Sequence, residues 1–272
     1  MIYFVGEARD SYEKLGLKGD RMGYFASRAA AMGPVPAEVV IAAFYNFNPD
    51  LVRRSIPDAW SLASPSDILA ARLQSAGLAL QRGLGAELTG SSELRDASVL
   101  ARRAALAASD HLAGRPLFAA HASLPWPDEP HLVLWHAQTL LREYRGDGHV
   151  AALVNADLDP VEALVTHVAA GEVNAGFLRA SRAWGDEAWN SGVDRLRSRG
   201  LMTGEGEALA FTDAGRVLRQ RVEDDTDRLS VAAYQAIGEE GCRRLRELAR
   251  PLSVAVVNNG LLNVDPNRFL DG

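Results

Sequence analysis

An internal repeat is the feature that most restricts how this 272-residue chain can fold. Four segments of the first half recur in the second half in the same order, displaced by 123 to 135 residues. The pairs are PAEVVIAAF and PVEALVTHV, RRSIPDAW and SRAWGDEAW, RLQSAGL and RLRSRGL, and RPLFAAHASLPWPDEP and RPLSVAVVNNGLLNVDP. Because order and spacing are both kept, the sequence predicts two copies of one module, at residues 1–125 and 126–272.

The spacing of apolar residues predicts a mainly helical chain. Leucine and alanine recur at helical intervals, and the abundance of alanine, leucine, arginine and glutamate favours helix. Helices are expected over residues 66–83, 92–113, 130–145, 149–155, 160–170, 175–182, 186–199, 213–233 and 238–258. Three prolines in LPWPDEP, residues 124–130, predict an extended linker. A two-stranded hairpin is expected at 201–212, and Gly146 and Gly148 are expected to interrupt the long helix.

The second copy contains motifs of a known family. The segments PVEALVTHVAAG and EAWNSGVDRLRSRGLMTGEGEALAFTDAGRVL resemble the winged-helix core of the MarR regulators. The positions that carry this resemblance are Val193, Asp194, Arg195, Leu196, Gly200, Leu201, Thr212, Asp213, Ala214 and Gly215. The C-terminal segment AIGEEGCRRLRELARPL resembles the dimerisation helix of that family.

The whole chain also resembles actinobacterial tandem helix-turn-helix proteins, in which stretches like GYFASRAA and REYRGDGH recur. Together the resemblances imply a mainly α fold of duplicated MarR-like winged-helix modules that form a pseudo-dimer within one chain. Residues 1–125 would be a degenerate winged-helix-like module. Residues 126–272 would be the recognisable module, preceded by a long helix.

The predicted DNA-reading surface is acidic. Asp186 and Glu187 begin the expected recognition helix, where the helix dipole favours carboxylates but a DNA phosphate would be repelled. The expected wing carries Glu205 and Glu207 and no cation, and the net charge of the chain is −6. Arg195, Arg197 and Arg199 are interpreted as a solvated helix face. Because phosphate neutralisation supplies most non-specific affinity, we expect that DNA binding has been lost and that no nucleic acid is a partner.

The repeat also predicts a ligand pocket. A displacement of 124 residues places RMGYF of the first copy opposite RGDGH of the second, so Arg21 pairs with Arg145 and Phe25 with His149. In MarR-like dimers this region lines the ligand cleft, as the resemblance implies. The expected ligand-binding residues are Arg21, Tyr24, Arg28, Phe44, His136, Arg145 and His149. The expected ligand is a bulky, partly aromatic small molecule with an anionic group facing Arg145 or Arg21, and haem or another bulky aromatic cofactor is an alternative.

Two other functions stay open at this level. An enzyme would use His149 or His136 as general acid or base, with Asp147 or Glu143 orienting it. A ligand-responsive MarR-type regulator is the function that the resemblance implies. No nucleophile elbow or phosphate loop is present, and two histidines without a third close ligand do not predict a metal site.

Composition restricts the expected cellular location of the protein. The only cysteine is Cys242, no apolar run approaches the ~20 residues of a membrane span, and no leader pattern begins the chain. A cytoplasmic protein with no membrane partner is expected. If the C-terminal helices of both copies pair within one chain, the protein is a monomer or a weak dimer.

Overall fold

The computed structural model describes residues 2–19 and 21–261 of the chain. The described residues are mainly helical, which confirms the expected class. They divide into two compact units. Of the described residues, those within 2–35, 55–144 and 231–261 form unit 1, and residues 36–54 and 145–230 form unit 2. Each unit therefore draws on both sides of position 125, and the module boundary read from the repeat stays a prediction.

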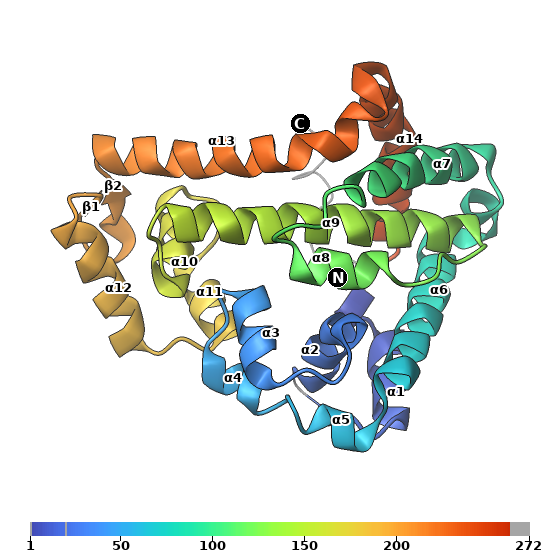
Figure 1. The fold of residues 1–272 in the computed structure, drawn as a ribbon, viewed down its shortest axis with the longest axis horizontal. Helices are drawn as coiled ribbons and strands as arrows, with labels where there is room; N and C mark the ends of the chain where they lie inside the picture. Colours follow the sequence, from blue (N-terminus) through green and yellow to red (C-terminus); the bar gives the residue numbers. More distant parts are fainter. Residues whose placement is uncertain (1, 20, 262–272) are drawn as a thin grey trace. The chain divides into compact units, whose positions relative to one another are not determined.

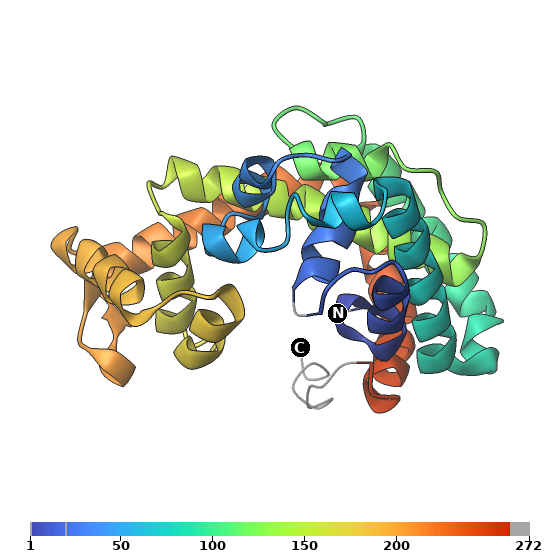
Figure 2. The ribbon, with the colours of Figure 1, turned by 90° about the horizontal axis from the view of Figure 1, so that it is seen from below.

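Unit 1 is built from the N-terminal, central and C-terminal helices. Its elements are η1 (Ile2–Phe4), α1 (Gly6–Lys14), α2 (Met22–Ala29), η2 (Ala30–Met32), α5 (Ala59–Leu62), α6 (Pro65–Thr89), α7 (Ser92–Ala108), α8 (Pro116–Ala122), the first part of α9 (Pro130–Asn155), the end of α13 (Asp213–Gln235), and α14 (Gly238–Asn258). In Figure 1, α7 and α14 lie side by side. Figure 2 shows α1 packed along α6.

The core of unit 1 depends on small side chains. The buried face of α7 carries Ala97, Ala101, Ala104 and Ala108, which share one hydrophobic cluster with leucines of α14, among them Leu248. Small residues let two helices approach closely, and each fully buried leucine stabilises the packing by about 1.5–3 kcal/mol. The Ser91 hydroxyl caps α7 by accepting a hydrogen bond from the backbone N–H of Leu94 at 3.1 Å.

Unit 2 contains a three-helix segment followed by a hairpin. Its elements are α3 (Ala37–Phe44), α4 (Pro49–Arg53), the end of α9, α10 (Pro160–Ala169), α11 (Ala175–Arg182), α12 (Asp186–Ser198), β1 (Met202–Thr203), η3 (Gly206–Ala208), β2 (Ala210–Phe211), and most of α13. Strands β1 and β2 are antiparallel, with Met202 opposite Phe211. The hairpin expected at 201–212 is confirmed, and Figure 1 shows it directly after α12.

Local chemistry explains these elements. Asp159 and Glu162 form a capping box at the start of α10, because each side chain accepts from the backbone N–H of the other residue. Gly192 lets α12 approach α10 closely, since a Cβ there would lie 2.7 Å from Val161 Cγ1. Gly204 turns the hairpin with a φ of +79°, which L side chains rarely adopt.

The predicted break in the long helix is wrong. Helix α9 continues through Gly146 and Gly148 to Asn155, so Asp147 lies inside a helix and does not cap a new one. Each glycine costs about 1 kcal/mol of helix propensity relative to alanine. Buried residues on both sides of the glycines, such as Tyr144 and Ala152, offset that cost. Helices α1 to α5 and α8 were not predicted. Among the described residues, no helix combines the length and apolar character needed to cross a bilayer.

Candidate functional site

A buried ion pair joins α2 to α9 inside unit 1. The Nη2 atom of Arg28 donates to both carboxylate oxygens of Glu143, at 2.9 and 3.2 Å. Glu143 is 2% exposed, and Arg142 of the same helix also donates to its Oε1. Burial alone would raise the pKa of Glu143, but the guanidiniums of Arg28 and Arg142 outweigh it, and the net shift is downward. Glu143 is therefore a buried anion that pairs with two arginines.

Tyr24 extends this ion pair. Its hydroxyl accepts a hydrogen bond from Arg28 Nη1 at 2.6 Å, and its ring stacks on Phe4 with centroids 5.2 Å apart. Arg21, one turn earlier, lies over the same Phe4 ring at 5.2 Å. Arg28 thus contacts both Tyr24, which was predicted with it as a ligand-binding residue, and Glu143, which was predicted to orient a catalytic histidine.

Arg72 and His121 form a second buried group beside the ion pair. Arg72 is 2% exposed, and its Nη1 lies 3.3 Å from Nδ1 of His121, which is completely buried. Burial holds the pKa of His121 well below its usual value, and the neighbouring guanidinium of Arg72 lowers it further. The imidazole is therefore neutral. Since a guanidinium only donates, Nδ1 accepts and Nε2 carries the proton, 4.0 Å from Glu143 Oε1 and without a hydrogen-bond partner.

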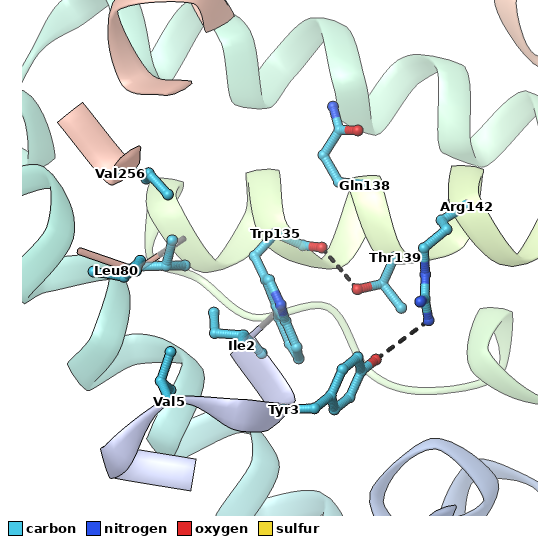
Figure 3. A pocket seen from close by; sticks show the side chains of 10 residues that line it. Ile2, Tyr3, Val5, Leu80, Trp135, Gln138, Thr139, Arg142 and Val256 are labelled. Carbon is cyan, nitrogen blue, oxygen red and sulfur yellow. Dashed lines mark hydrogen bonds between the residues drawn. The ribbon is translucent and has the colours of Figure 1, made fainter. Parts of the chain in front are cut away.

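Tyr3 connects this buried group to a cavity. Its hydroxyl lies 3.3 Å from Arg72 Nη2 and 3.4 Å from Arg142 Nη2. Figure 3 shows Tyr3 directed toward Arg142, with Trp135 beside it. The cavity has a volume of about 240 Å³. Its lining consists of Ile2, Tyr3, Val5, Leu80, Trp135, Gln138, Thr139, Arg142, Val256 and Leu261.

The cavity combines apolar walls with few polar groups. Ile2, Val5 and Leu80 form one side and Val256 another, and the ring of Trp135 also lines the cavity. The Arg72 guanidinium lies 4.9 Å from the centroid of that ring. A mostly apolar hollow with a few convergent polar groups is the usual composition of a small-molecule site.

His136 is in unit 1 but has another environment. It is 4% exposed and packs edge-on against Trp126, with ring centroids 4.7 Å apart. Burial, together with the nearby guanidiniums of Arg72 and Arg102, lowers its pKa to about 4. A histidine with this pKa is neutral near pH 7 and is a weak base, so the arrangement does not favour general acid catalysis by His136.

The remaining candidates belong to unit 2. Arg145 is about half exposed and faces Glu223 at 3.3 Å and Asp227 at 3.5 Å. His149 Nδ1 lies 2.9 Å from Thr226 Oγ1, and burial, with the nearby His167, lowers its pKa to about 4.

Asp147 and Phe44 are buried. The ring of Phe44 lies 6.3 Å from that of Phe47, centroid to centroid. Arg145, His149 and Phe44 thus each contact different neighbours within unit 2.

Arg195 and Arg197 of α12, and Arg199 directly after that helix, all contact carboxylates. Arg195 Nε lies 3.5 Å from Glu162, whose other oxygen lies 3.4 Å from Arg199. Arg197 contacts Asp194 at 3.2 Å. The side chains of Asp186 at the start of α12 and of Glu205 in the hairpin are exposed, at 78% and 91%.

Sequence reasoning missed Arg72, His121, Tyr3 and Trp135. One signal was present: Arg72 follows Ile68 by four residues and precedes Ala76 by four, and both of these are buried. A charged residue at helical spacing on the apolar face of α6 indicates a buried charge, which is rare in proteins and could have identified Arg72 as a candidate.

The arrangement of α10, α11, α12 and the hairpin defines a helix-turn-helix protein. Residues 1–263 match the model of a helix-turn-helix family, and the chain belongs to that family. No curated protein and no solved structure was found to match it.

Proposed function

We propose that this protein binds a small, largely apolar molecule in the cavity lined by Tyr3, Trp135 and Arg142, and that its helix-turn-helix unit no longer binds DNA. The observation that carries the first part is the cavity itself, which adjoins a buried, hydrogen-bonded group of charged residues within one unit. Such buried polar groups are costly to fold, and they are common where a ligand has to be oriented.

The size of the cavity bounds the ligand. Small-molecule sites usually span roughly 300–1,000 Å³. The volume here, about 240 Å³, lies just below that range. A molecule with one or two rings therefore fits better than a haem, and the apolar walls and the Trp135 ring favour an aromatic one.

The charge of the helix-turn-helix segment supports the second part. Residues 159–216 contain nine acidic residues, six arginines and no lysine. Arg195 and Arg197 of α12, and Arg199 directly after it, pair with Asp159, Glu162 and Asp194, so a DNA phosphate would have to compete with these carboxylates. Since non-specific DNA affinity comes from such contacts, this surface should bind DNA weakly at physiological salt.

Ligand binding is favoured over catalysis by the state of the histidines. His136 and His149 both have pKa values lowered to about 4, by burial first, so neither changes its charge near neutral pH.

Two duplicated MarR-like modules remain part of this proposal. The order of helices from α3 to α7 parallels that from α10 to α14, and α7 and α14 share one core.

The test is native mass spectrometry of the protein purified from its own host. We expect a retained molecule of roughly 100–250 Da, the size that the cavity admits. Val256→Trp, which places an indole in the cavity, should abolish retention. Val99→Trp is the matched control, because Val99 is 66% exposed on α7 and lines no part of the cavity. Equal retention by wild type and both variants would place the ligand elsewhere.

A shift assay with promoter DNA tests the proposed loss of DNA binding. Nanomolar, salt-sensitive binding of that DNA would refute it.

A further inference from the structure

Arg72 is a buried cation without a carboxylate partner among the described residues. Its guanidinium contacts are the neutral His121 imidazole, the Tyr3 hydroxyl, and the rings of Trp135 and Tyr3. Its Nε atom is buried and has no hydrogen-bond partner. Buried charges are normally paired, because transfer of an isolated ion from water costs several kcal/mol.

The surrounding charges do not compensate Arg72. Three guanidiniums, those of Arg28, Arg72 and Arg142, lie around one carboxylate, Glu143. Both Glu143 oxygens receive hydrogen bonds from Arg28, and one of them receives a further bond from Arg142. His121 is held neutral by its burial and adds no negative charge. The cluster therefore carries an excess of positive charge at the wall of an apolar cavity.

The Tyr3 hydroxyl occupies the position between two of these cations. One oxygen lies 3.3 Å from Arg72 Nη2 and 3.4 Å from Arg142 Nη2, both longer than a strong charge-assisted hydrogen bond. Tyr3 belongs to η1, a three-residue turn, and its ring lines the cavity (Figure 3). A neutral oxygen on a short terminal turn thus fills a place where an anionic oxygen would be bound more strongly.

We propose that the cavity takes a monocarboxylic acid with an apolar ring, and that its carboxylate displaces the Tyr3 hydroxyl to pair with Arg72 and Arg142. This rests on the proposed function and specifies its ligand. A carboxylate matches the planar fork of a guanidinium, whereas the apolar walls disfavour a more strongly hydrated phosphate. The cations differ from Arg145 and Arg21, which the sequence suggested for this role.

The experiment compares two probes by titration calorimetry: 2-naphthoate and its neutral analogue 2-naphthamide. They have nearly the same size and shape and differ in charge. We expect naphthoate to bind about tenfold more tightly or better, as a charge-assisted hydrogen bond provides. Arg72→Met keeps the length of the side chain and removes its charge. It should reduce naphthoate affinity to that of the amide and leave the amide unchanged. Arg243→Met, an exposed arginine of α14, is the control and should alter neither.

Tyr3→Phe tests the displacement and does not depend on folding of the Arg72 variant. It removes the competing hydroxyl and keeps the ring, so naphthoate affinity should rise severalfold while that of naphthamide stays constant. Unchanged or weaker naphthoate binding by Tyr3→Phe would overturn the displacement. If the wild type bound both probes with equal affinity, the proposal that the ligand carries a carboxylate would be wrong, whereas the proposal that the cavity binds a small molecule would still hold. Binding of neither probe, by the wild type or by Tyr3→Phe, would overturn both.

Discussion

Replacement of Glu143 by glutamine should strongly destabilise unit 1. The substitution keeps the volume of the side chain and removes the negative charge that two arginines share. Arg28, whose side chain is 11% exposed, would then keep its charge in a buried place and would face a neutral amide oxygen instead of a carboxylate. Removing one partner of a buried ion pair typically costs 3–5 kcal/mol.

The expected change in melting temperature follows from that cost. The amide oxygen preserves part of the hydrogen bonding, so about 3 kcal/mol is the appropriate figure. In proteins of this size, 1 kcal/mol shifts the Tm by roughly 2–4 °C, which gives a decrease of about 6–12 °C. Thermal unfolding followed by circular dichroism at pH 7 measures it. Glu240→Gln, in an exposed pair with Arg243, is the matched control and should leave the Tm unchanged.

The pH dependence of the Tm difference distinguishes the loss of the Glu143 charge from a change in packing. The folded protein lowers the pKa of Glu143, so its stabilisation is complete above the unfolded value of about 4.3 and is lost as pH falls toward the folded value. The Tm difference between wild type and Glu143→Gln should therefore be constant from neutral pH down to about pH 5.5 and shrink below about pH 4.3. A Tm decrease under about 2 °C at pH 7, or a difference that persists unchanged at the lowest pH, would refute the reasoning.

Four further predictions follow from the same contacts. Arg72→Met should not lower the Tm, because it removes an uncompensated buried charge; a decrease of more than about 3 °C would show that Arg72 is compensated. His136→Phe should make stability less dependent on pH between 6.5 and 4, since His136 stays neutral when folded but protonates when unfolded, a cost of up to about 1.4 kcal/mol per pH unit as pH falls. Light scattering should give a mass near 29.3 kDa, because α7 and α14 pair within the chain; a stable dimer would contradict this. The double variant Glu187→Lys, Glu205→Lys should bind duplex DNA more tightly than wild type, with steeper salt dependence, and equal binding would exclude charge as the reason for weak affinity.

The sequence by itself determined the helices from α10 to α14 and their order. Helices α11 and α14 begin and end where the pattern predicted, and α10 and α12 end within a residue of it. The reason is that capping residues such as Asn174 and Asp159 act on the backbone within three positions, and apolar periodicity within one helix is equally local. The hairpin was predictable for the same reason, through its glycines.

Only the tertiary structure decided the candidate site. Arg28 and Glu143 are 115 positions apart, Arg72 and Tyr3 are 69 apart, and Arg72 and His121 are 49 apart. Nothing local distinguishes Glu143 from an ordinary surface glutamate, and the helix through Gly146 and Gly148 persists because residues on both sides are buried. Burial and charge pairing depend on which distant segments pack together. Propensity and spacing act along the chain, so they predict where helices form but not which arginine is left in the core without a counterion.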